Sequence, residues 1–199
     1  MKKGLAILGA MLAVTVVTWA LSHPTPSITF TFGLAQLAGT LALTGLAANL
    51  FIASRSRSVQ KLFGSVASIN VVHKWLGIGS VAMTLVHIAV FQLDRMLNGT
   101  KLSKAPIAHV AAVSILLFLG LVILALVAKK LTPAAWLNWH RLMLLAYVIG
   151  LVHYYGSSSY RPLGASPLSV WMDLVTLFAV CSVLALYWGR RKNLTRPNN

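Results

Sequence analysis

Apolar residues gather along this chain in six long blocks, and short segments rich in basic or polar residues separate one block from the next. A helix that crosses a membrane needs about 20 mostly apolar residues, and each block approaches that length. The segments between the blocks are too short to hold a second domain. We therefore predict an all-α integral membrane protein, a six-transmembrane-helix bundle that forms one domain over residues 1–199. Its helices are expected near residues 4–21, 29–53, 69–92, 107–128, 138–156 and 168–188.

The first block resembles a secretory signal peptide, because Lys2 and Lys3 precede an apolar run. That run, from Leu5 to Leu21, is long for a signal peptide, and no clear pattern of small residues at a cleavage site follows it. We predict a helix that stays in the protein, with cleavage as the alternative.

The composition agrees with a membrane protein and argues against nucleic-acid binding. Hydrophobic residues make up 58% of the chain and charged residues only 10%, against about 25% charged residues in a typical soluble domain. The net charge is +15, because 17 lysines and arginines face only Asp94 and Asp173. In a soluble protein this charge would suggest nucleic acid as a partner, but cytoplasmic loops of membrane proteins collect the same residues. We therefore expect membrane lipid, and not nucleic acid, around this chain.

The distribution of basic residues over the loops predicts the orientation of the chain. The larger set lies on one side and comprises Lys2, Lys3, Arg55, Arg57, Lys61, Lys129, Lys130, Arg190, Arg191, Lys192 and Arg196. The smaller set comprises Arg95, Lys101, Lys104 and Arg161. Because cytoplasmic loops are enriched in lysine and arginine, we expect the larger set and both termini in the cytoplasm. The expected location is a bacterial cytoplasmic (inner) membrane, which the protein crosses several times.

Two further observations limit the cofactors. Cys181 is the only cysteine, which excludes an internal disulfide, a CxxCH haem attachment and a cysteine-ligated iron–sulfur cluster. The chain has no Walker motif and no GxGxxG after a strand pattern. It is therefore not expected to bind a dinucleotide or a flavin in a domain of its own.

Four of the six histidines lie inside predicted helices, where ionisable residues are costly and usually functional. His73 and His87 share the third helix, and His140 and His153 share the fifth. Both helices run in the same direction, so the histidines fall at two matched depths, separated by about 21 and 20 Å of helical rise. Haem iron takes two axial ligands, which imidazoles on facing helices supply. The pattern therefore indicates two stacked b-type haems.

The angular positions fit this arrangement on one helix only. At about 100° per residue, a step of 14 residues returns to within about 40° of the same face, whereas a step of 13 misses it by about 140°. The fifth helix must therefore tilt or bend, for example near Gly150, or the haems must be offset. Small residues near the histidines would leave room for a flat macrocycle, although ordinary helix packing explains them as well. They are Gly77, Gly79, Ser80 and Gly150.

Three other interpretations of the histidines stay open. They are polar residues hydrogen-bonded inside a bundle, ligands of a transition-metal transporter, or members of a proton pathway. Two parallel pairs are hard to explain as isolated hydrogen bonds. A transport site normally adds carboxylates or thiolates to histidine, and a proton pathway normally contains a chain of acids. Asp173 is the only carboxylate expected inside the membrane.

Other residues are candidates for haem contacts. Haem propionates need cations or hydrogen-bond donors at the membrane faces. Lys74 and Arg141 directly follow the inner histidines, and Arg161 is a candidate at the outer face, together with two lysines on that side. Tyr147 lies midway between the two histidines of the fifth helix. It is a candidate for an aromatic ring between the haems, and packing in the core is the alternative.

A histidine pair with 13 intervening residues on the third helix, followed by a pair with 12 on the fifth, resembles the ferric reductase-like transmembrane domain superfamily. That superfamily includes the membrane cores of NADPH oxidases and ferric reductases. It also includes the haem subunit of the bacterial periplasmic methionine sulfoxide reductase system. The resemblance covers about residues 1–190. It implies that His73 pairs with His140 on an inner haem, and His87 with His153 on an outer haem.

The resemblance also implies a direction and partners. Electrons would pass from the cytoplasmic side to the outer side. Longer relatives carry a flavin and NAD(P)H domain after the sixth helix. This chain is expected to lack that domain, so the expected donor is a separate cytoplasmic flavoprotein or quinol, with flavin or quinone supplied through the partner. The acceptor would be an outer-face redox protein or a small acceptor such as ferric iron or oxygen.

Two departures from the NADPH oxidases argue against superoxide production. Those enzymes place a further histidine one turn after the outer ligand of the third helix, where this chain has Phe91. They also carry an arginine in the second helix, which residues 29–53 lack. We therefore expect the electron-transfer subunit of an oxidoreductase, with no catalytic residue of its own. A quinol-linked cytochrome b anchor of a larger complex and a transition-metal transporter are the alternatives.

Overall fold

The structure is a computed structural model, and it describes residues 1–22, 29–99, 105–127, 130–157 and 165–194. All regular secondary structure within these residues is helical, which confirms the all-α class. The helices are α1 (Lys2–Leu21), α2 (Phe30–Ala53), α3 (Arg57–Phe63), α4 (Val66–Asn98), α5 (Ala105–Leu126), α6 (Pro133–His140), α7 (Leu142–Gly156) and α8 (Pro167–Leu194).

Four helices are long and apolar enough to cross a membrane, namely α1, α2, α4 and the Pro167–Trp188 part of α8. The helices expected near 107–128 and 138–156 are present as α5 and as the pair α6 and α7. In α5 the apolar stretch is shorter, His109–Leu124, and the other helix is interrupted at Arg141. The membrane character is confirmed, and six complete spans stay a prediction.

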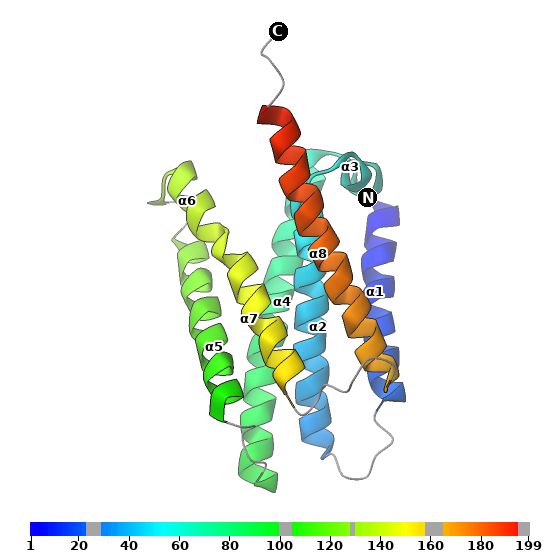
Figure 1. The fold of residues 1–199 in the computed structure, drawn as a ribbon, viewed down its shortest axis with the longest axis vertical. Helices are drawn as coiled ribbons and strands as arrows, with labels where there is room; N and C mark the ends of the chain where they lie inside the picture. Colours follow the sequence, from blue (N-terminus) through cyan, green and yellow to red (C-terminus); the bar gives the residue numbers. More distant parts are fainter. Residues whose placement is uncertain (23–28, 100–104, 128–129, 158–164, 195–199) are drawn as a thin grey trace.

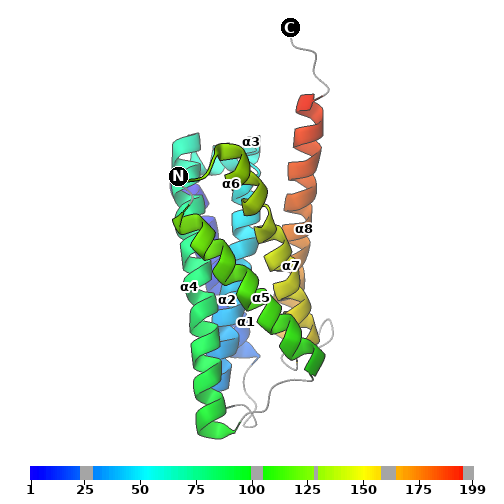
Figure 2. The same ribbon diagram turned by 90° about the vertical axis from the view of Figure 1, so that its left-hand side faces the viewer.

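The long helices form a bundle with α2 near its centre (Figure 1). The most extensive packing is between α2 and α4. α2 also contacts α1, α7 and α8, while α5 packs against α7 and crosses the bundle obliquely (Figure 2). The start of α1, the end of α8 and the short helix α3 lie at one end of the bundle. We call this the inner end, and the opposite end the outer end.

The sequence of α2 explains its central place. Its buried residues are mainly alanine, glycine and threonine, and small residues let helix backbones approach closely inside a membrane. A side-chain carbon at Gly45 would clash with Oγ of Ser80 on α4. The Ser80 hydroxyl is satisfied within its own helix, since it donates to the carbonyl of Leu76 at 2.9 Å. α2 therefore approaches α4 more closely than a larger residue at this position would allow.

Polar side chains join α1 to the bundle. Thr15 is fully buried, and its hydroxyl lies 3.1 Å from that of Thr44 on α2. The indole nitrogen of Trp171 on α8 donates to Thr15 Oγ1 at 2.8 Å. Removing α1 would deprive Thr44 and Trp171 of these partners, a cost that matters where water is scarce. The retention of α1 stays a prediction, and the contacts show what the helix contributes.

α4 is longer than the sequence indicated. It continues past the expected end near residue 92 and stops at Gly99, whose φ of 64° lies in the left-handed region where glycine has no steric penalty. Asp94 and Arg95 therefore lie on the helix and not in a loop. Asp94 is fully buried, and the expectation that Asp173 is the only carboxylate inside the membrane stays a prediction.

The buried carboxylate of Asp94 ties the end of α4 to the start of α2. It accepts hydrogen bonds from the hydroxyls of Thr29 and Thr31 and from Nδ2 of Asn98 at 2.7 Å. Thr29 also caps α2, because its hydroxyl accepts from the backbone nitrogen of Phe32 at 3.2 Å. The outer ends of the two helices are therefore fixed relative to each other.

Substitutions at two glycines test the close approach of α2 to α4. Gly45→Ala should lower the stability of the folded protein by about 1–3 kcal/mol, because the added methyl group has no room beside Ser80. Gly79→Ala is the matched control, since open space surrounds that position, and the better helix propensity of alanine should add up to about 1 kcal/mol. Thermal unfolding in detergent measures both. Equal effects of the two variants would show that α2 and α4 are not closely packed at Gly45.

Candidate functional site

The structure brings the four helical histidines together in two pairs. The ring centroids of His73 on α4 and His140 at the end of α6 are 5.9 Å apart, with an angle of 72° between the ring planes. The centroids of His87 on α4 and His153 on α7 are 6.3 Å apart, with an angle of 67°. We call the first the inner pair and the second the outer pair. The histidines of α4 thus meet those of α6 and α7 at two levels of the bundle.

The fifth predicted helix is interrupted between its two histidines. α6 ends at His140 and α7 begins at Leu142, and the intervening Arg141 keeps right-handed helical angles. The backbone nitrogen of Leu144 bonds to the carbonyl of Arg141, a tighter turn than that of an α-helix. Gly150, the example that the sequence suggested for a bend, lies inside α7.

α2 supports both histidines of α4. The Nδ1 atom of His87 lies 2.7 Å from the backbone carbonyl oxygen of Ala35. The backbone of Asn49 faces the ring of His73, although Nδ1 of His73 makes no direct hydrogen bond among the described residues. Ala35 and Asn49 are 14 residues apart, as are the two histidines. When Nδ1–H donates to a carbonyl, the lone pair of Nε2 stays available for a metal.

The outer pair lies in a cavity of about 380 Å³, within the size range of cofactor pockets. Residues of α2, α4, α5 and α7 line it, and most are apolar. Gly39 on α2 gives the ring of His87 its room, because a side-chain carbon there would lie only 3.0 Å from Nδ1. Gly150, which the sequence singled out as a space-making residue, also lines this cavity.

Two aromatic residues cover the outer side of His87. The ring of Phe91 stacks against the imidazole with a centroid distance of 6.4 Å and an angle of 17°. Phe32 on α2 packs against Phe91 with a centroid distance of 6.1 Å. Both line the cavity. The direct contacts of the His87 ring on this side are therefore apolar, and Gln92 and Arg95 line the cavity farther out.

An aromatic residue also supports the inner pair. The indole of Trp136, one turn before His140 on α6, stacks on its imidazole with centroids 4.9 Å apart and an angle of 26°. This stacking restrains the ring of His140.

The two ring separations agree with a metal bound between the imidazoles of each pair. With metal–nitrogen bonds of about 2 Å and ring centres about 1 Å behind the nitrogens, imidazoles on opposite sides of one metal have centroids about 6 Å apart. The observed values are 5.9 and 6.3 Å. Among the described residues, no group of three or more histidine, cysteine, aspartate or glutamate side chains is arranged for a metal ion. Two axial ligands at each level are what haem requires.

The basic residues that the sequence predicts as propionate contacts are exposed where the structure describes them. Lys74 is exposed, and its Nζ lies 5.9 Å from the ring centroid of Trp75. Arg141 is also exposed and donates to Oδ1 of Asn138 at 3.3 Å. Arg161 lies outside the described residues. Their proposed contacts with haem propionates therefore stay predictions.

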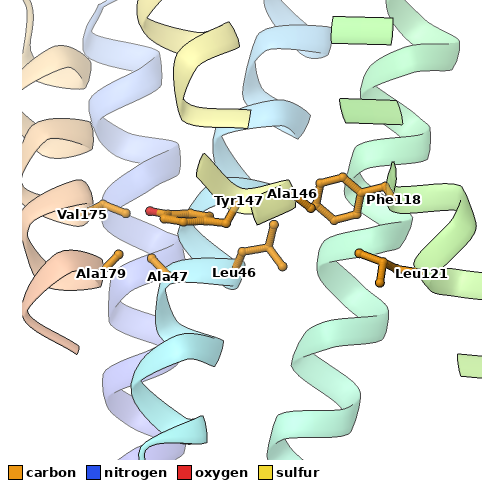
Figure 3. Close-up of a cluster of buried hydrophobic side chains, with 8 residues drawn as sticks. All are labelled: Leu46, Ala47, Phe118, Leu121, Ala146, Tyr147, Val175 and Ala179. Atoms are coloured by element: carbon orange, nitrogen blue, oxygen red, sulfur yellow. The ribbon is translucent and has the colours of Figure 1, made fainter. Parts of the chain in front are cut away.

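Tyr147 is buried in a cluster of apolar side chains at the level between the two pairs. Figure 3 shows its ring extending toward Val175 on α8. Phe118 of α5 belongs to the same cluster and also lines the outer cavity. The ring of Tyr147 packs in the core, its buried hydroxyl has no hydrogen-bond partner among the described residues, and a role between the haems stays a prediction. The cluster comprises Leu46, Ala47, Phe118, Leu121, Ala146, Tyr147, Val175 and Ala179.

Sequence reasoning missed several residues of the site. Arg95 and Gln36 line the outer cavity, and Trp136 stacks on His140. Trp136 precedes its histidine by one helical turn, a spacing visible in the sequence. Gly39 and the carbonyl of Ala35 carry no such signal, because their role depends on the register between α2 and α4.

The sequence matches a family model described as "Ferric reductase like transmembrane component" over residues 38–151. The match covers more than half of the chain and contains three of the four paired histidines. It ends two residues before His153, which the geometry adds to the set. No curated protein shows a significant match to the chain.

Enlarging Gly39 tests the outer pair. Gly39→Val places branched carbons against the ring of His87, so we expect a haem held by the outer pair to be lost and one held by the inner pair to stay. Gly9→Val introduces the same side chain into open space on α1 and should leave the haem content unchanged. The haem-to-protein ratio of each purified variant measures the effect. Full haem content in Gly39→Val would show that Gly39 does not shape this site.

Proposed function

The chain belongs to the family of ferric reductase-like transmembrane components, and we propose that it transfers electrons across a membrane through two b-type haems. The observation that carries the proposal is the meeting of two histidine pairs at two levels of one bundle, with ring separations of 5.9 and 6.3 Å. His73 and His140 hold the inner haem, and His87 and His153 hold the outer one. Bound haem supplies one-electron chemistry between ferric and ferrous iron.

The residues of the chain position the haems and set their surroundings. The carbonyl of Ala35 accepts from Nδ1 of His87 and holds the ring with Nε2 directed at the iron. Trp136 restrains His140 by stacking. Because both axial positions are filled by imidazole, neither iron has an open site, which suits electron transfer more than oxygen binding.

The direct contacts of His87 favour electron delivery over oxygen chemistry. Phe91 and Phe32 cover the imidazole itself on its outer side, and the polar side chains of Gln92 and Arg95 line the cavity farther out along α4. The outer haem is therefore proposed to pass electrons to an acceptor that approaches its edge. That acceptor is an outer-face redox protein or a small acceptor such as ferric iron.

The basic residues support the proposed direction. α3 and the segment before it carry Arg55, Arg57 and Lys61 at the inner end, where α1 starts and α8 ends. By the positive-inside rule this end faces the cytoplasm, in a bundle of six spans in a bacterial inner membrane. Electrons enter there from a separate flavoprotein or from quinol and leave at the outer end. No catalytic residue is assigned, since the proposed protein is the electron-transfer subunit of an oxidoreductase.

Replacing one histidine of the outer pair tests this proposal. The purified parent should show b-type bands in its reduced-minus-oxidised absorption spectrum and about two haems per chain. His87→Ala should lower the ratio to about one, because only the outer iron loses a ligand, and His153→Ala should give the same result. His109→Ala is the control, since that residue is exposed and is not among the residues that line the outer cavity. A folded parent without b-type bands would contradict the proposal. A parent with one haem per chain would mean that only one histidine pair binds haem.

A further inference from the structure

The one charged side chain among the described residues that line the outer cavity lies at its outer end. On α4, Gln92 and Arg95 line the cavity beyond His87, toward the outer end of the helix. On the other side of the histidine, the lining includes the hydroxyl residue Thr84 together with Leu46 and Phe118, which belong to the apolar cluster between the pairs. The outer end of the cavity therefore carries a guanidinium, and its inner end carries apolar and hydroxyl side chains.

Arg95 supplies a positive charge at the outer end of the cavity. It lies two helical turns, or about 12 Å, beyond His87 on α4, and it is partly buried. Its Nη1 donates to Oε1 of Gln92 at 3.0 Å. Among the residues that the structure describes, the partner of the Arg95 guanidinium is this amide, while the neighbouring Asp94 carboxylate accepts from Thr29 and Asn98. A cation beside an apolar cavity without a counter-charge is costly unless an anion binds there.

Gln36 on α2 adds a second unsatisfied group. It lines the cavity, and its Oε1 atom is buried without a hydrogen-bond partner among the described residues. The two ends of a glutamine amide exchange by rotation, so either the carbonyl or the NH₂ group faces the cavity. The cavity thus offers a guanidinium and two amides to a ligand with oxygen atoms.

We propose that Arg95, positioned by Gln92, binds the propionate carboxylates of the outer haem and so fixes its orientation. This inference rests on the proposed function. The propionate edge of the macrocycle then faces the outer end, and its apolar edge faces Leu46 and Phe118. The hydrogen bonds of Asp94 to the start of α2 hold the last turn of α4 in place, and with it the backbone of Arg95. The alternative is an arginine that merely extends toward the membrane surface, which would not fix the orientation of a haem.

The midpoint potential of the outer haem tests the proposal on the complete, haem-loaded protein. Reduction adds an electron, so a nearby cation favours the reduced state. Arg95→Gln should therefore lower the potential of the outer haem and leave that of the inner haem unchanged, while Arg95→Lys keeps the charge and should restore most of the parent value. Arg57→Gln, at the inner end on α3, is the matched control and should not change the outer potential.

A second measurement identifies the groups that Arg95 contacts. Haem-free protein is loaded with haem or with its dimethyl ester, whose propionates carry no charge. The parent should hold haem more tightly than the ester at the outer site, and Arg95→Gln should lose that preference, since the two changes remove the same contact. If Arg95→Gln sheds the outer haem, restoration by Arg95→Lys supports the proposal. A parent-like outer potential and an unchanged preference in Arg95→Gln would overturn it. A parent without an outer haem would instead contradict the proposed function.

Discussion

The close packing of α2 against α4 is the contact on which both histidine pairs depend. Glycine and alanine on α2 let its backbone approach α4, and the same backbone then presents a carbonyl to His87 and the Asn49 peptide to His73. The equal spacing of Ala35 from Asn49 and of the two histidines means that one helix register serves both levels. Inside a membrane, where water cannot satisfy a polar ring, the carbonyl of Ala35 gives His87 a partner that a side chain would otherwise have to provide.

Apolar packing separates the two levels and gives the bundle its rigidity. Side chains from α2, α5, α7 and α8 meet in one cluster between the inner and the outer pair. The cluster fixes the distance between the pairs and keeps water from the space between them. A haem protein tunes its iron through ligand identity, hydrogen bonding and burial, and in the proposed function helix packing would supply the burial and the hydrogen bond of His87 to Ala35. In the proposed function, the residues around each pair and the electron donor and acceptor would then determine the chemistry at each end.

Much of this arrangement was predictable from the sequence, because it depends on local patterns. Long apolar blocks predict helices, and the positions of the four histidines predict two matched levels, which the structure brings together. The break at Arg141 was not predictable, since no proline or glycine marks it. The length of α4 was missed because Asp94 and Arg95 look like loop residues, although buried hydrogen bonds to α2 keep Asp94 on the helix. The roles of Gly39 and Ala35 depend on the register between α2 and α4, and this register cannot be predicted from a single sequence.

The central claim is that electrons cross the membrane from one pair to the other. The most direct measurement uses the haem-loaded protein in sealed vesicles that contain ferricyanide, with a reductant that cannot cross lipid added outside. The account predicts that the trapped ferricyanide is reduced only in vesicles that carry the protein, at a rate that falls sharply when the outer haem is removed. Vesicles in which both haems become reduced while the trapped ferricyanide stays oxidised would contradict it.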